Sequence, residues 1–268
     1  MNQILPAILI VGGIGLIFGC ILAFASVIFA VQTDEREEQV LEVLPGANCG
    51  ACGFAGCSAY AAAVAKGEAG VGCCSVGKAP VAEKIAEIMG VAAENAAPKT
   101  AKVFCGGTCE NASQKFEYVG IQDCIAANKV AGGAKTCAYG CLGLGTCAKV
   151  CPFGAISVQD GVAVVDEEKC VACGKCVAIC PKHVIRIVPA GKKVHVLCSS
   201  GDAGAAVNKA CKTGCIGCRI CEKNCPKEAV WVENNLAAID YEKCVGCGIC
   251  AAKCPKKAIT GRREQGEE

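Results

Sequence analysis

The sequence predicts an α+β chain in which a single N-terminal transmembrane helix precedes a series of small domains held together by bound metal. Three observations predict it. The run from Ile4 to Val31 has no charged side chain and exceeds the roughly 20 residues that cross a bilayer. Cysteine supplies 27 of the 268 residues, whereas Phe, Tyr and Trp are too few to fill several ordinary cores. A cysteine-rich segment also occurs twice, and each copy is too small to be stable through apolar burial alone.

The N-terminal run is expected to be a retained anchor rather than a signal peptide. No Lys or Arg precedes Ile4, and the run is longer than the apolar region of a signal peptide. Thiolates that bind metal must stay reduced, which is typical of the cytoplasm. We therefore expect an inner (cytoplasmic) membrane protein that crosses once, with residues 34–268 on the cytoplasmic side.

Composition excludes two other classes of protein. A formal charge of +2 provides no basic footprint for nucleic acid. The number of cysteines is odd and their spacing recurs, so a disulfide scaffold explains them less well than metal ligation does. Metal ligation is therefore the better interpretation of the cysteines.

The internal repeat matches residues 141–185 with residues 215–259. Seven cysteines of the first copy have counterparts in the second: Cys141 and Cys215, Cys147 and Cys221, Cys151 and Cys225, Cys170 and Cys244, Cys173 and Cys247, Cys176 and Cys250, Cys180 and Cys254. Residues 163–165 and 238–239 are expected to be short strands. The residues between cysteines are expected to form single helical turns.

The pattern C-x2-C-x2-C-x3-C-P begins three times, at Cys170, Cys215 and Cys244. In this pattern a compact loop offers three thiolates to one 4Fe-4S cluster, and the fourth cysteine, before proline, binds the neighbouring cluster. Zinc ribbons also use paired C-x2-C units, but they need neither the third cysteine nor the C-P ending. Each copy of the repeat is therefore expected to be a bacterial two-cluster ferredoxin-like module.

The motif assigns most ligands directly. The second copy has two complete sets, which are Cys215, Cys218, Cys221 and Cys254, and Cys244, Cys247, Cys250 and Cys225. The first copy has one complete set, which is Cys170, Cys173, Cys176 and Cys151. Its other set retains Cys141, Cys147 and Cys180, with Leu144 where a cysteine is expected. We expect Cys137 to supply the missing thiolate, and a three-iron cluster is the alternative.

A further 4Fe-4S cluster is expected near the start of the chain. Its ligands would be Cys49, Cys52 and Cys57, followed by Cys74 rather than Cys73. Ile85, Ile88 and Met89 recur at helical spacing, which predicts an amphipathic helix over Val81–Val91 that ends at Gly90. This helix is expected to pack on the cluster domain.

Five cysteines outside the motifs suggest another cluster. Cys105, Cys109 and Cys124 resemble three ligands, with a fourth from Cys198 or Cys211, or from Cys137 if that residue is not used above. We therefore expect five clusters and suspect a sixth. The expected segments are an anchor (1–33), an N-terminal 4Fe-4S domain (34–97), a cysteine-containing insert (98–136), two ferredoxin-like modules (137–190 and 191–260) and a polar tail (261–268).

No residue set predicts substrate chemistry in this chain. His183 and His195 are isolated, and each is expected to be a surface or packing residue. The sequence contains no Ser/His/Asp set, P-loop or paired acids. Bond-making steps are therefore expected elsewhere.

The arrangement resembles a known family. The stretch from Asn48 to Tyr60 (NCGACGFAGCSAY), together with residues 104–109 (FCGGTC) and 140–145 (GCLGLG), is similar to the long form of the B subunit of the Rnf complex, the ion-translocating ferredoxin:NAD oxidoreductase. The resemblance implies that the chain accepts electrons from reduced ferredoxin and passes them to membrane-embedded and flavin-bearing subunits, which reach NAD and pump sodium ions or protons. It would then be the electron-transfer subunit of a translocase. The alternatives are a related complex that reduces a redox-sensing transcription factor and a membrane-tethered cluster scaffold.

Overall fold

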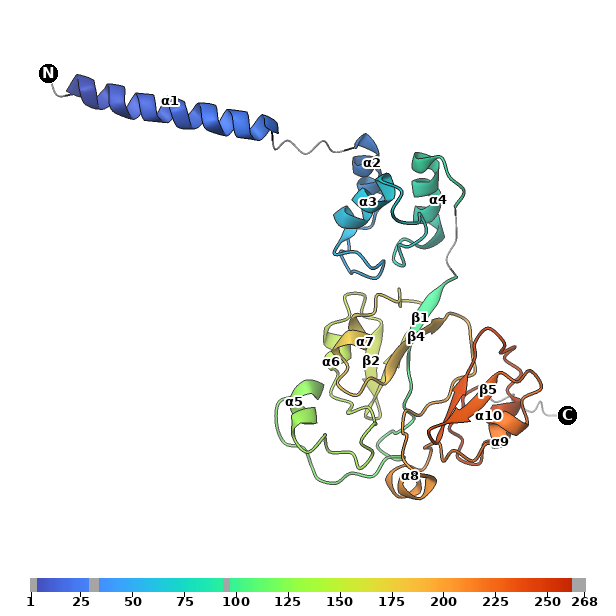
Figure 1. The fold of residues 1–268 in the computed structure, drawn as a ribbon. Helices are drawn as coiled ribbons and strands as arrows, with labels where there is room; N and C mark the ends of the chain where they lie inside the picture. The colour runs from blue at the N-terminus through green and yellow to red at the C-terminus, as the bar shows by residue number, and fades with distance from the viewer. Residues whose placement is uncertain (1–3, 29–33, 94–96, 262–268) are drawn as a thin grey trace.

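The computed structural model describes residues 4–28, 34–93 and 97–261 (Figure 1). Its helices and strands are short after the first helix. In chain order they are α1 (Ile4–Ile28), α2 (Glu35–Val43), α3 (Cys57–Ala65), α4 (Lys78–Met89), β1 (Lys99–Val103), α5 (Cys124–Lys129), α6 (Thr146–Lys149), β2 (Ile156–Gln159), β3 (Val162–Val165), α7 (Lys175–Ile179), β4 (Ile185–Pro189), α8 (Gly204–Ala210), α9 (Ile220–Lys223), β5 (Val230–Glu233), β6 (Leu236–Ile239) and α10 (Ile249–Lys253).

The expected transmembrane helix is the part of the predicted fold class that is wrong. Within the described part of the chain, no helix is both long and apolar enough to cross a membrane. The small mixed helix-and-strand domains that follow agree with the α+β prediction.

The first domain is a group of helices around one small core. Val40 of α2, Tyr60 and Val64 of α3, and Ile85 of α4 are almost completely buried together. The helix predicted over Val81–Val91 is confirmed as α4. It ends at Gly90, whose φ of 67° is the left-handed conformation that terminates helices at glycine.

The two ferredoxin-like copies have matching secondary structure. The hairpin β2–β3 in the first copy corresponds to β5–β6 in the second, and both are antiparallel. Each hairpin turns through two residues with positive φ, Asp160 and Gly161 or Asn234 and Asn235, as a type I′ turn requires. The predicted short strands and single helical turns are confirmed as β3 and β6, and as α6, α7, α9 and α10.

The repeat is longer than the sequence alone indicates, because each copy also includes an extended segment before its first motif that pairs with the end of the copy. In the first copy β1 pairs with β4, so that Val103 lies opposite Ile185 (Figure 1). In the second copy Val196 forms a bridge to Ile259. We therefore call residues 99–189 repeat 1 and residues 192–260 repeat 2.

The strand match continues into the next residue of each copy. The N–H of Phe104 donates to the carbonyl of Val184, and the N–H of Leu197 donates to the carbonyl of Ala258. Cys105 and Cys198, one residue further on, therefore occupy equivalent positions. Sequence alignment of the motifs does not reveal this match, because repeat 1 has the longer segment between this strand and its first motif.

Each repeat has a core of small aliphatic residues and cysteines. In repeat 1 Val184 and Ile185 pack with buried Cys141, Cys147 and other cysteines. In repeat 2 Val194 and Val196 pack in the same way with Cys221 and Cys250. Because the cysteines lie within the cores, any group that they bind is also part of the core.

Candidate iron–sulfur centres

The state of the cysteines favours clusters over disulfides or single metal ions. All 27 cysteines are free. Among the described residues, no three His, Cys, Asp or Glu side chains converge closely enough to hold one metal ion. A zinc site would bring four thiolates within about 2.3 Å of one ion. In a 4Fe-4S cluster each thiolate binds a different iron, so the sulfur atoms lie farther apart.

Repeat 2 has two cavities lined by the predicted ligand sets. Cys215, Cys218, Cys221 and Cys254 line one of about 350 Å³. Cys225, Cys244, Cys247 and Cys250 line another of about 320 Å³. Burial is the main cause that raises the pKa of the Cys221 thiol to about 11, and the neighbouring thiols of Cys215, Cys218 and Cys254 contribute to this value. The donor set and the space both fit a 4Fe-4S cluster.

In the complete cysteine set of repeat 1, one sulfur atom is hydrogen-bonded to β1. The Sγ of Cys170 accepts hydrogen bonds from the N–H of Ala101 in β1 at 3.3 Å and from the N–H of Ala172 at 3.5 Å. Burial raises the pKa of the Cys176 thiol to about 11, and the nearby thiols of Cys170 and Cys173 add to the shift. Cys151 packs against the same core.

The incomplete set of repeat 1 receives a fourth cysteine from an unexpected place. Cys124 lines a cavity of about 330 Å³ together with Cys141, Cys147 and Cys180. Burial, together with the thiols of Cys141, Cys124 and Cys180, raises the pKa of the Cys147 thiol to about 12. Cys137, which the sequence analysis favoured for this place, lines a different cavity.

The position of Cys124 follows from the start of α5. Asp123 caps this helix, and its Oδ1 accepts from the N–H groups of Ile125 and Ala126, both at 2.9 Å. Its other oxygen, Oδ2, accepts from the hydroxyl of Thr146 at 2.8 Å, and that hydroxyl oxygen accepts from the N–H of Cys124 at 2.6 Å. Thr146 begins α6, so these bonds attach α5 to the cluster motif of repeat 1.

The N-terminal domain brings its predicted cysteines near one another. Burial raises the pKa of the Cys74 thiol, and the thiols of Cys57 and Cys49 contribute to the shift. The N–H of Gly77 donates to the Sγ of Cys74 at 3.4 Å. Cys73 has an exposed side chain, and its N–H donates to the hydroxyl of Tyr60 at 3.3 Å.

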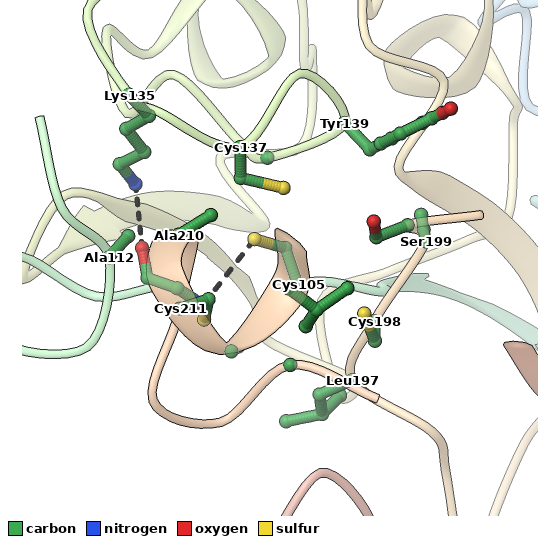
Figure 2. A pocket seen from close by; sticks show the side chains of 16 residues that line it. Cys105, Ala112, Lys135, Cys137, Tyr139, Leu197, Cys198, Ser199, Ala210 and Cys211 are labelled. Carbon is green, nitrogen blue, oxygen red and sulfur yellow. Dashed lines mark hydrogen bonds between the residues drawn. The ribbon is translucent and has the colours of Figure 1, made fainter. Parts of the chain in front are cut away.

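A further cavity, of about 430 Å³, is lined by residues of both repeats (Figure 2). Its four cysteines are Cys105, Cys137, Cys198 and Cys211. Cys109 and Cys124, the other candidates for this site, lie elsewhere. Cys109 is exposed, and its N–H donates to the carbonyl of Asp160 in the β2–β3 turn at 2.8 Å.

The two histidines occupy the surface and packing roles predicted for them. His183 is exposed. His195 is buried, with its Nε2 2.7 Å from the carbonyl of Lys192 and its Nδ1 2.8 Å from the hydroxyl of Tyr241. Since a carbonyl only accepts, Nε2 carries the proton and Nδ1 accepts from Tyr241. Burial lowers the pKa of His195, so the neutral ring is favoured.

Three family models match parts of the chain. The model described as "Putative Fe-S cluster" matches residues 44–76. The 4Fe-4S dicluster domain matches residues 214–259, and the 4Fe-4S binding domain matches residues 163–186. These matches fall on the N-terminal domain and on both repeats.

Three curated proteins are similar over most of the chain. The B subunit of a Na⁺-translocating ferredoxin:NAD⁺ oxidoreductase complex from Acetobacterium woodii is 48% identical over 268 residues, which is 100% of this chain and 80% of the relative. The B subunit of a proton-translocating ferredoxin:NAD⁺ oxidoreductase complex from Clostridium ljungdahlii is also 48% identical, covering 90% of this chain and 85% of the relative. The B subunit of an ion-translocating oxidoreductase complex from Methanosarcina acetivorans is 42% identical, with 90% and 92% covered.

Proposed function

Because the chain belongs to the family of B subunits of Rnf-type ion-translocating ferredoxin:NAD oxidoreductase complexes, we propose that it relays electrons from reduced ferredoxin to the other subunits of such a complex. Its place is in the electron-transfer part of an oxidoreductase. The observation that carries this proposal is the grouping of cysteines in sets of four within cores that match 4Fe-4S domain models.

Five clusters account for the four cysteine sets of the two repeats and for the set of the N-terminal domain. Four are in the two repeats, and the fifth is held by Cys49, Cys52, Cys57 and Cys74. Cys124 supplies the fourth ligand of the incomplete set, because it is the cysteine that shares a cavity with Cys141, Cys147 and Cys180. Bound clusters supply one-electron exchange at potentials set by charge, hydrogen bonds to sulfur and exposure.

The chain's own residues bind the irons and control their surroundings. Thiolates bind the irons, and backbone N–H groups such as those of Ala101 and Gly77 donate to ligand sulfur. Such bonds stabilise negative charge on the ligands and thereby affect the reduction potential. All of these ligand side chains except that of Cys218 are buried or partly buried, which limits water access. None of these roles makes or breaks a bond in a substrate.

The family of the chain supports a location at a membrane. Membership of an ion-translocating complex associates the chain with a membrane through its partner subunits. The cluster domains face the cytoplasm in this proposal, because free thiolates require a reducing compartment.

The test compares two cysteine variants in the assembled complex. In Cys247→Ala the loss of one ligand should reduce ferredoxin-dependent NAD reduction by detergent-extracted membranes at least tenfold. The matched control is Cys73→Ala, whose thiol is exposed and belongs to no proposed ligand set, and its activity should equal that of the native chain. Normal turnover by an assembled Cys247→Ala complex would contradict the electron-relay role.

A further inference from the structure

The cavity shared by the two repeats is built from equivalent positions. Cys105 and Cys198 each lie two residues after a valine that pairs with the end of its own repeat, Val103 in β1 and Val196 in an isolated bridge. Cys137 and Cys211 each precede the first motif cysteine, Cys141 or Cys215, by the same number of residues. Each repeat therefore contributes the same two cysteines, and Figure 2 shows the four side chains around one space.

Reciprocal hydrogen bonds hold the two halves of this cavity together. The N–H of Gly106 donates to the carbonyl of Leu197 at 2.9 Å. In the opposite direction, the hydroxyl of Ser199 donates to the carbonyl of Phe104 at 2.9 Å. Leu197 and Phe104 are equivalent residues, as are Ser199 and Gly106. The two bonds therefore join equivalent positions of the repeats, although one donor is a backbone N–H and the other a hydroxyl.

From this arrangement we propose that Cys105, Cys137, Cys198 and Cys211 hold a sixth 4Fe-4S cluster, which lies between the repeats and takes two ligands from each. The proposal rests on the proposed function for the class of cofactor. The ligand set itself rests on the cavity, whose four cysteines lie outside all three matched family models.

The surroundings of the four sulfur atoms suit a negatively charged cluster. The Sγ of Cys105 accepts from the N–H of Gly107 at 3.4 Å and from the N–H of Cys141 at 3.3 Å. Lys135 lines the cavity and is 5% exposed, and its ammonium group donates to the carbonyls of Gly107 at 2.7 Å and Gly161 at 2.8 Å. A buried cation offsets part of the cost of burying cluster charge.

The cavity adjoins a proposed cluster site in each repeat. In repeat 1 the N–H of Cys141, a proposed ligand, donates to the Sγ of Cys105 at 3.3 Å. In repeat 2 the backbone of Cys215, the equivalent residue, lies close enough to the Cys198 thiol to lower its pKa, against the larger raising effect of burial. A cluster held here would therefore be next to a ligand residue of each repeat and would exchange single electrons, with no proton or bond transferred.

The cysteine count agrees with six sites. Six sets of four leave three of the 27 cysteines without a ligand role, namely Cys20, Cys73 and Cys109. All three have exposed side chains, whereas Cys218 is the one exposed thiol among the proposed ligands. Exposure thus separates the unassigned cysteines from nearly all of the assigned ones.

The first test measures iron and acid-labile sulfide per chain in the anaerobically purified complex. The double variant Cys198→Ala/Cys211→Ala should contain about four fewer iron atoms and four fewer sulfides than the native chain. The matched control Cys73→Ala/Cys109→Ala should contain the native amounts. Unchanged iron in the first variant, or the loss of a single iron atom, would overturn the proposal.

A second test needs no substitution and applies even if the double variant does not fold. The loaded native complex is treated anaerobically with iodoacetamide, and the modified cysteines are identified by peptide mass spectrometry. Cys109 and Cys73 should react, whereas the four bridging cysteines should react only after iron is chelated. Reaction of these four in the loaded complex at the rate of Cys109 would overturn the proposal.

Neither measurement depends on electron transfer to NAD. A bridging cluster can thus be confirmed or rejected whatever the Cys247→Ala assay shows about the proposed function.

Discussion

Repeats 1 and 2 have matching secondary structure, but different kinds of side chain meet at one equivalent contact. In repeat 1 the residue before Val103 is Lys102, whose Nζ pairs with Glu167 at 2.9 Å in a partly exposed ion pair. In repeat 2 the equivalent residues are His195 and Tyr241, which form a hydrogen bond of 2.8 Å beside the core. The scaffold determines where two side chains meet, whereas their charge and burial can change.

The repeats also complete their first cluster site in different ways. Repeat 2 uses Cys218 from its motif, whereas repeat 1 has Leu144 there and places Cys124 of α5 in the cavity. The longer segment of repeat 1 thus places a fourth cysteine at the cavity whose motif lacks one. A cluster site depends on four converging thiolates and not on their order in the chain.

The largest expected effect is that of removing the iron, which should unfold both repeats together. Their aliphatic cores are small, and cysteines form part of each core. Treatment with an iron chelator under anaerobic conditions should abolish most of the far-ultraviolet circular dichroism of the strands and should make both repeats sensitive to protease. Survival of one repeat as a protease-resistant fragment would show that the two differ in how much they depend on metal.

A ligand exchange tests whether the two cluster sites are equivalent. Cys124→Ala and Cys218→Ala should each remove one 4Fe-4S signal from the electron paramagnetic resonance spectrum of the reduced protein, because each leaves three thiolates. Adding Leu144→Cys to Cys124→Ala should restore the signal, since it recreates in repeat 1 the motif of repeat 2.

The control for this exchange is Leu144→Cys alone, which should leave the iron content unchanged because Cys124 already completes the set. Failure of the double variant to regain the signal would mean that the backbone at Leu144 does not present a ligand as Cys218 does.

A smaller effect is expected from breaking the equivalent contacts of the two repeats. Tyr241→Phe leaves the Nδ1 of a buried His195 without a donor, at a cost of about 1–3 kcal/mol. Glu167→Gln removes a partly exposed ion pair, at a cost of about 0.2–1 kcal/mol. Denaturant unfolding of the loaded protein at pH 7.5 should therefore show the larger loss for Tyr241→Phe. An equal loss for both variants would mean that burial does not distinguish the contacts.

The smallest effect is a pH dependence confined to repeat 2. Burial lowers the pKa of His195 below its usual 6.5, so the unfolded chain binds this proton more readily than the folded chain. The stability gained by burying a neutral His195 is fully present above pH 6.5, and it is lost as the pH falls from there toward the lowered pKa. His195→Gln should reduce the dependence of stability on pH between 5 and 6.5, measured by hydrogen exchange in repeat 2. An unchanged slope would contradict the neutral, buried state of His195.

The sequence predicts the local parts of this molecule well. The repeated motifs predict short strands and short helices, because each of these depends on residues close together in the chain. The cysteine sets predicted for repeat 2 line two of its cavities. The Gly90 stop of α4 is local in the same way.

Features that depend on distant contacts were not predicted. Cys124 reaches its cavity through the Asp123–Thr146 hydrogen bond, which joins two segments that share no motif. The match between Cys105 and Cys198 is hidden by the unequal segments that follow them, although Val103-Phe104-Cys105 and Val196-Leu197-Cys198 offered a weak signal. The transmembrane prediction, which relied on the length of the run from Ile4 to Val31 and its lack of charge, was wrong: in the described part of the chain no helix is long and apolar enough to cross a membrane.

The bonds around Gly106 and Ser199 join equivalent positions of the two repeats in both directions, which resembles an isologous interface, in which the same surface of each partner meets the other. A chain with one repeat would carry only half of the proposed bridging site and would need a second copy to complete it. Joining both halves in one polypeptide makes that association intramolecular, with an effective concentration in the millimolar range for a short linker. Residues 190–191 connect repeat 1 to repeat 2, so completion of the proposed site would not depend on how much of the protein a cell contains.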